Sequence, residues 1–217
     1  MNRRTDIPRG SHPEPEPIIQ DPEQRAFIEA QNGLLQYDQV LRLVEGAEAK
    51  FRLRPSTIMD LNRIAIQKLY PFAGNYRTGS VLIKNTSHVP PAAEHVARLI
   101  EEMCDYVNDK WNSSAIHLAS YAMWRLNWIH PFFEGNGRTS RAVSYLVLCV
   151  KLGYKLPGTP AIPEQIVANR QPYYEALDRA DAAWEKREID VSAMETLLSS
   201  MLAAQLLSVV ETATGQQ

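Results

Sequence analysis

The segment that most constrains the fold is residues 141–153, RAVSYLVLCVKLG, which is apolar on almost every side of a helix. A helix that is hydrophobic all round is stable only when other elements surround it. Gly153 is suited to end this helix, because glycine readily takes the left-handed conformation found just past helix C-termini. The segment therefore predicts a buried central helix.

Helical periodicity recurs along most of the remaining chain. Apolar residues three or four positions apart predict helices at residues 25–53, 56–70, 91–111 and 113–129, and two more follow around 172–186 and 191–210. Ser56 is expected to cap the second of these helices, and Pro91 to open the third. The apolar face expected for the first helix consists of Leu34, Tyr37, Leu41, Val44 and Ala47.

One segment breaks this helical pattern. Residues 74–91, GNYRTGSVLIKNTSHVPP, combine turn residues with the β-favouring run SVLI. We expect a short β-hairpin there, on an otherwise all-α body. Residues 1–22 are rich in proline and charge, which predicts a disordered tail. Residues 23–215 are then expected to form one domain.

Composition restricts the partners and the compartment. The formal net charge of −2 gives no bulk reason to expect nucleic acid. No signal peptide and no membrane span are expected, and Cys104 and Cys149 are predicted to be buried thiols, so we expect a cytoplasmic protein. The last helix is apolar enough to be core or a homodimer face.

Side chains that could take part in catalysis or anion binding cluster in residues 130–141, HPFFEGNGRTSR. His130 precedes a proline, so the preceding helix should end there. A glycine turn then enters the central helix, whose first amides and positive dipole end favour an anion. Arg138 and Arg141 lie in its first turns, where two cations oppose the dipole unless a polyanion such as a di- or triphosphate lies between them.

The remaining groups of this stretch fit group transfer to an alcohol. Glu134 would repel phosphates unless Mg²⁺ intervenes, and His130 has the pKa range of a general base for an attacking hydroxyl. His130 and Glu134 could instead be metal ligands, but the HExxH zinc pattern is absent and no third ligand lies nearby. Singly, each residue is more often structural; their joint occurrence carries the inference.

These twelve residues resemble the signature of the Fic (Fido-fold) family, His-Pro-Phe-x-Asp/Glu-Gly-Asn-Gly-Arg-x-x-Arg, at every motif position, and the resemblance extends from about residue 25 to 210. It implies a mainly helical fold and a protein adenylyltransferase that transfers AMP from ATP to a Ser, Thr or Tyr hydroxyl (AMPylation). By motif position, His130 would be the general base and Glu134 the Mg²⁺ ligand. The phosphate-binding residues would be Gly135, Asn136, Gly137, Arg138 and Arg141.

The resemblance implies further roles outside the motif. The hairpin would be a flap that binds the target protein by strand addition. Asn169, Tyr173 and Tyr174 resemble the adenine-side segment, although tyrosines at helical spacing are often core. The related Doc branch, which phosphorylates its targets, carries Lys where Gly137 stands, so glycine favours nucleotidyl transfer. The flap residues would be Arg77, Thr78, Gly79, Ser80 and Val81.

The segment LRLVEG, residues 41–46, is similar to the family's inhibitory motif Ser/Thr-x-x-x-Glu-Gly/Asn. Glu45 would then pair with Arg141 and displace the γ-phosphate. Leu41 occupies the Ser/Thr position, so an exposed helix glutamate before a glycine is an equal alternative. Two other functions stay open: a related transferase that uses another nucleotide donor or removes AMP from a target, and a non-catalytic nucleotide-binding interaction module.

Overall fold

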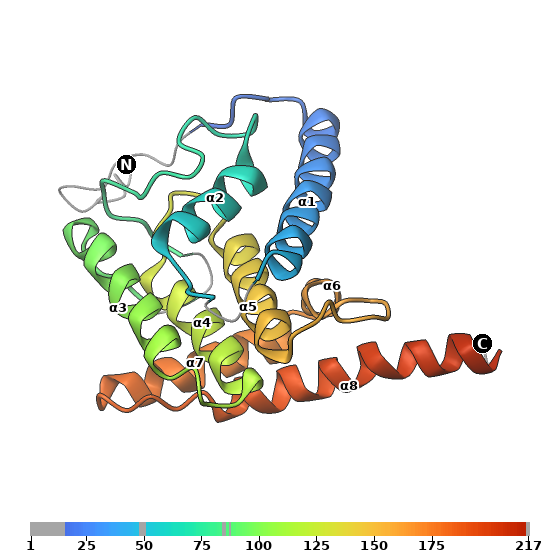
Figure 1. Ribbon diagram of the computed structural model, residues 1–217. Coiled ribbons are helices and arrows are strands. Elements are labelled where there is room, and N and C mark those ends of the chain that lie inside the picture. The colour runs from blue at the N-terminus through green and yellow to red at the C-terminus, as the bar shows by residue number, and fades with distance from the viewer. Residues whose placement is uncertain (1–15, 48–50, 84–85, 87, 216–217) are drawn as a thin grey trace, which may run out of the picture.

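The computed structural model describes residues 16–47, 51–83, 86 and 88–215 (Figure 1). Within these residues the protein is mainly helical, as the sequence predicts. Residues 1–15, most of the predicted tail, lie outside the described residues; Ile18 donates its N–H to the carbonyl of Leu69 (2.8 Å), and the first helix begins at Pro22. The helices are α1 (Pro22–Glu45), α2 (Pro55–Ile66), the 3₁₀ helix η1 (Ala93–His95), α3 (Val96–Asp109), α4 (Ala115–Ile129), α5 (Asn136–Leu152), α6 (Ile162–Ala168), α7 (Gln171–Glu185) and α8 (Ser192–Thr214).

The centre of the fold is α5, which packs most extensively on α4 and is also covered by α1, α2 and α6 (Figure 1). Its residues Val143, Leu146 and Val147 are fully buried, and Gly153 ends it in the left-handed conformation. The predicted central helix is therefore confirmed. On its other side α4 packs against α3, α7 and α8, so the site at the α4–α5 junction rests on two buried helices.

The buried face predicted for α1 is wrong in part, because Val44 is buried as expected but other predicted residues are not. Leu34 and Tyr37 are exposed, whereas Asn32 and Gln36 are buried with Val40 and Val44. The reason lies in α2. The Asn32 amide donates to the carbonyl of Gln67 (2.8 Å), and the Gln36 amide donates to that of Leu61 (2.9 Å). Buried polar groups are stable when they are hydrogen-bonded in this way.

Other helix boundaries also differ from expectation. Arg54, not Ser56, is the N-cap of α2, and no side chain caps this helix. The third predicted helix does not open at Pro91, because a 3₁₀ turn at Ala93–His95 precedes α3. The short helix α6 was not predicted. Cys104 and Cys149 are buried free thiols, as expected.

The predicted hairpin is not confirmed. The described part of residues 74–91 forms no strand, and only Ser80 has the pattern of an isolated β-bridge. Residues 84, 85 and 87 of this segment lie outside the described residues. What orders the segment is a side chain: Arg77 is buried, and its guanidinium binds main-chain carbonyls instead of pointing to solvent.

The C-terminal half of α8 extends beyond the other helices (Figure 1), and Leu207 and Val210 are exposed on it. Contrary to the sequence-based expectation, this helix is long and apolar enough to cross a membrane by length and composition. Helices from protein cores pass the same test, and the first half of α8 packs its residues Met194 and Leu198 into this domain.

Candidate active site

His130 lies at the junction that the sequence predicts. Helix α4 ends at Ile129, and His130 takes a left-handed backbone conformation (φ 49°) while its N–H still donates to the carbonyl of Leu126 (3.0 Å). A non-glycine residue with positive φ is uncommon and indicates that the surrounding structure holds it in place. The chain thus turns sharply at His130 before entering the glycine loop.

The imidazole of His130 is neutral at physiological pH. Burial, followed by the positive charge of Arg77, lowers its pKa from 6.5 to about 4. Its Nδ1 is buried next to the main chain of Asn127, which leaves Nε2 as the nitrogen that can face a ligand. A neutral imidazole with an accessible nitrogen is able to accept a proton.

The side chain of Arg77 is hydrogen-bonded to the main chain of His130. Its Nε donates to the carbonyl of His130 (2.8 Å) and its Nη1 to that of Gly79 (3.0 Å), while Nη2 donates to Pro91. The main-chain N–H of Arg77 also donates to Pro131 (2.9 Å). The side chain predicted to belong to the flap is therefore a brace between the flap segment and the end of α4.

The turn after His130 requires glycine at one position. Gly135 has φ 80°, and a Cβ there would lie 2.6 Å from Cγ2 of Ile66. The Asn136 side chain spans the loop, accepting from the N–H of Phe132 (2.9 Å) and donating to its carbonyl (2.8 Å). The amide of Asn136 is thus committed to the loop, and its main-chain N–H is what it presents at the start of α5.

The start of α5 has the geometry of an anion site. The first amides of a helix, here those of Asn136, Gly137 and Arg138, have no intrahelical acceptor, and the helix dipole is positive at this end. A Cβ at Gly137 would lie 3.3 Å from Nη1 of Arg141. Glycine there leaves room between the amides and the arginine.

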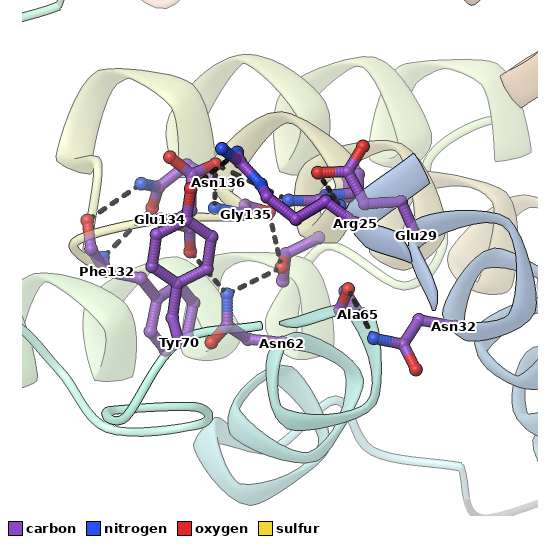
Figure 2. A network of polar contacts seen from close by, with 12 residues as sticks. Arg25, Glu29, Asn32, Asn62, Ala65, Tyr70, Phe132, Glu134, Gly135 and Asn136 are labelled. Carbon is purple, nitrogen blue, oxygen red and sulfur yellow. Dashed lines mark hydrogen bonds and ion pairs between the residues drawn. The ribbon is translucent and has the colours of Figure 1, made fainter. Parts of the chain in front are cut away.

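Asn62 of α2 is a site residue that the sequence did not reveal. It is fully buried, and its Nδ2 donates to the carbonyl of Glu134 (3.0 Å) and to Oγ1 of Thr139 (3.2 Å). Its Oδ1 accepts from the N–H of Gly74 (3.0 Å). Figure 2 shows this amide beneath the glycine loop. Its neighbours Asp60 and Arg63 are polar as well, so no signal in the sequence set Asn62 apart.

Charged groups surround the loop on the side of α1. Oε1 of Glu134 accepts from the N–H of Gly135 (2.9 Å) and lies 3.5 Å from Nη2 of Arg138. Glu29 of α1 approaches Nη1 of the same arginine (3.9 Å), and Figure 2 shows Arg25 and Glu29 next to the loop. Arg138 therefore lies between two carboxylates.

The predicted pairing of Glu45 with Arg141 is wrong. Glu45 forms an ion pair with Lys155, beyond the other end of α5. Helix α1 runs alongside α5 in the same direction, with Tyr37 stacked on Tyr145 (6.1 Å between centroids), so its last residues lie far from the start of α5. The acidic residue of α1 that faces the motif is Glu29, sixteen positions earlier.

Arg141 is mostly buried, and burial lowers its pKa. Within the described ranges its side chain forms no hydrogen bond and no ion pair. Tyr173 is its neighbour on α7 and is itself buried. A desolvated guanidinium without a carboxylate is costly, and this cost is offset when an anion binds.

A cavity of about 430 Å³ adjoins His130 on the side of α7. Of the three predicted adenine-side residues, only Tyr174 lines it; Tyr173 is buried core and Asn169 is an exposed residue at the end of α6. The sequence did not predict the other lining residues. They come from the end of α4, from α7 and from the segment before α3: Asn127, Trp128, Gln171, Leu177, Asp178, Asp181, Ile83, Thr86 and His88.

None of the predicted flap residues lines the cavity beside His130. Thr78 and Ser80 are exposed, Gly79 is buried and Val81 is half-buried. Ile83, two residues further on, lines the cavity beside His130. Among the described residues no group of three or more potential metal ligands occurs, and Glu134 is a carboxylate that belongs to the loop itself.

The sequence is similar to a known family and to named proteins of other organisms. The model of the Fic/DOC family matches residues 52–148. "Protein adenylyltransferase Fic" of Drosophila willistoni is 30% identical over 158 residues, covering 71% of this chain and 30% of that protein. The protein of the same name from Nematostella vectensis is 28% identical, covering 69% and 34%. The chain thus spans about a third of the length of these relatives.

Solved structures share the fold. A Fic domain containing signaling protein from Bacteroides thetaiotaomicron aligns with a TM-score of 0.71 at 22% identity, covering 89% of this chain and 75% of that one. Fic-1 from C. elegans aligns at 0.66 with 21% identity, covering 87% and 53%. BepC from Bartonella tribocorum, solved with bound AMPPNP, aligns at 0.57 with 14% identity, covering 84% and 88%.

Proposed function

Since this chain belongs to the Fic/DOC family, we propose that it is a protein adenylyltransferase, which transfers AMP from ATP to a Ser, Thr or Tyr hydroxyl of a target protein. One observation carries the proposal: a neutral imidazole, that of His130, lies between an anion site at the start of α5 and a cavity of nucleoside size. The names of the curated relatives support the same reaction.

The triphosphate would bind at the start of α5. The amides of Gly137 and Arg138 would donate to phosphate oxygens, and the guanidinium of Arg141 would gain the anionic partner that it lacks among the described residues. Arg138 would have to exchange Glu29 for phosphate. The nucleoside would occupy the cavity beside Tyr174, and the AMPPNP bound to the Bartonella tribocorum protein is consistent with such a nucleotide.

His130 would act as the general base. The target hydroxyl oxygen attacks the α-phosphorus of ATP, the bond from that phosphorus to the β-phosphate oxygen breaks, and pyrophosphate leaves. The hydroxyl proton goes to Nε2 of His130, which is free to accept it because the ring is neutral. Arg77 fixes the main chain of His130, and the sharp turn at this residue aims the ring.

Glu134 fits a Mg²⁺ site of the kind that uses one carboxylate together with waters and phosphate oxygens. Its Oε1 is bound by the loop amide of Gly135, and Oε2 forms no bond within the described residues. When bound there, the ion would neutralise phosphate charge.

We also propose that residues 78–83 hold the main chain of the target protein, as a flap does. The free buried thiols suit a reducing, cytoplasmic compartment.

The test uses the purified chain with α-labelled and γ-labelled ATP and a cell lysate. We expect protein label only from the α-position, and its loss by a factor of about 10²–10⁴ in His130→Ala. His95→Ala, which changes an exposed histidine away from the site, is the matched control and should label normally. Label from the γ-position, or label that persists in His130→Ala, would contradict the proposal.

A further inference from the structure

The cavity at His130 continues outward into an open groove of about 780 Å³. The two share residues from the segment before α3, from α4 and from α7: Thr86, His88, Trp128, Asp178 and Asp181. Beyond these, the groove extends along α7 past Trp184 to Glu185 and Arg187. The groove therefore opens onto the cavity assigned to the nucleoside, and a target segment bound in the groove would lie beside the nucleotide rather than in its place.

The groove is acidic along one face of α7. Asp178, Asp181 and Glu185 follow one another at intervals of three and four residues, which puts their side chains on the same side of the helix. The basic lining residues are Arg187, which lies over the ring of Trp184 (5.6 Å), and His88. The lining thus holds three carboxylates and one guanidinium, and counting the buried guanidinium of Arg125 next to Trp184 still leaves the carboxylates in excess by one.

Two tryptophans form the apolar walls. Trp128 and Trp184 meet edge to face (6.0 Å between centroids), and the buried guanidinium of Arg125 lies against both rings, at 4.2 and 4.4 Å. Arg125 therefore fixes these two indoles. Asp181 is fixed as well: it accepts from Nε1 of Trp124 (2.7 Å) and lies 3.7 Å from the His88 ring. The groove is preformed, with Asp178 and Glu185 as its exposed acidic groups.

We propose that this groove binds the segment of the target protein next to the modified hydroxyl, and that it selects a lysine or arginine there. A long basic side chain can lay its methylene groups on an indole while its charge meets Asp178 and Glu185. The phosphates of the nucleotide do not suit the groove, because Asp178 and Glu185 would repel them, whereas the uncharged nucleoside can share the inner cavity with Asp178. The inference rests on the proposed function for the identity of its ligand.

Binding of synthetic peptides tests the groove without requiring transfer. Two fluorescent peptides share a central serine, and one carries lysines on both sides of it where the other carries glutamates. We expect the lysine peptide to bind at least several-fold more tightly by fluorescence anisotropy at low salt, with the difference shrinking as salt is added. Equal affinities, or a preference for the glutamate peptide, would overturn the proposal.

Charge-reversal variants test whether the preference for the lysine peptide arises from the carboxylates of the groove. Glu185→Lys and Asp178→Lys change exposed residues, and each should weaken the lysine peptide by about two- to fivefold, as expected for an exposed charge pair. The control Glu188→Lys changes an exposed residue that does not line the groove and should leave both peptides unaffected. An unchanged preference in both groove variants would contradict the assignment.

Peptide binding and labelling from ATP, taken together, separate this inference from the proposed function. If the lysine preference is observed but α-labelled ATP never labels a protein, the adenylyltransferase assignment fails and the groove assignment stands. If proteins are labelled but the peptides bind alike, the groove assignment alone fails.

Discussion

The two sides of His130 are built differently. On one side, residues 131–141 form a loop and helix start whose main chain is fixed by Asn62, Asn136 and Gly135. On the other, residues 78–83 form no regular strand among the described positions, and the buried guanidinium of Arg77 is what ties this segment to α4. Under the proposed function, the side fixed by hydrogen bonds would hold the triphosphate, which is the same in every reaction, and the irregular side would hold the variable protein target.

Of the substitutions considered, Gly135→Ala in the glycine loop should destabilise the protein most. A Cβ at φ 80° costs about 1–2 kcal/mol in strain, and its contact with Ile66 adds to that cost, so we expect a loss of about 2–4 kcal/mol in the free energy of unfolding. Gly153→Ala is the matched control, because Gly153 has φ 84° and a methyl group added there would meet nothing within 4 Å. Denaturant unfolding of both variants measures the difference; equal losses would show that Ile66 does not confine the loop.

Acidification should weaken the fold through His130. The folded protein holds this ring neutral to about pH 4, whereas the unfolded chain takes up a proton near pH 6.5. The unfolding free energy therefore falls as pH drops from 6.5 to 4, by about 3 kcal/mol from this group. Urea unfolding of the wild type and of His130→Gln across this range isolates the contribution. A pH dependence that is identical in the two proteins would contradict the burial of a neutral ring.

Asn62→Ala should cost about 1–3 kcal/mol, because it leaves the carbonyl of Glu134 and the N–H of Gly74 without their partner. We expect ATP binding to weaken along with stability, since the glycine loop loses its support. Asn75→Ala changes an exposed asparagine nearby and is the control. Calorimetric titration with ATP together with thermal unfolding would show whether the two losses occur together, and a stability loss with unchanged ATP affinity would limit Asn62 to a packing role.

Glu29→Gln should produce the smallest effect, and it should strengthen ATP binding, whereas Asn62→Ala should weaken it. Removing this charge releases Arg138 from a competitor of phosphate, so ATP should bind about two- to fivefold more tightly, as for a partly exposed ion pair. Glu45→Gln, which removes the pairing with Lys155, should leave ATP affinity unchanged. An effect of Glu45 that exceeds that of Glu29 would reverse the assignment made from the structure.

The side fixed by hydrogen bonds could be predicted from the sequence because its determinants are local. His130 before a proline, the glycine turn and the arginines of α5 follow one another within twelve residues, and the structure places them at one helix junction. The all-round apolar pattern of α5 likewise predicted a central helix, because few environments satisfy such a surface.

The remaining features depend on contacts between distant segments. Asn32 and Gln36 are buried because carbonyls of residues 61–67 need donors, and no spacing rule within α1 shows that. Glu45 resembled an inhibitory residue in sequence, but the direction in which α1 packs on α5 brings Glu29 to the motif instead. The groove residues of α7 join those of α4 only through tertiary packing.

The most direct test of the central claim is a crystal structure with a non-hydrolysable ATP analogue and Mg²⁺. We predict that the terminal phosphates contact the first amides of α5 together with Arg138 and Arg141, and that the α-phosphorus lies on the side of His130 from which Nε2 can reach an attacking hydroxyl. A triphosphate bound elsewhere, or an imidazole directed away from the α-phosphorus, would contradict it.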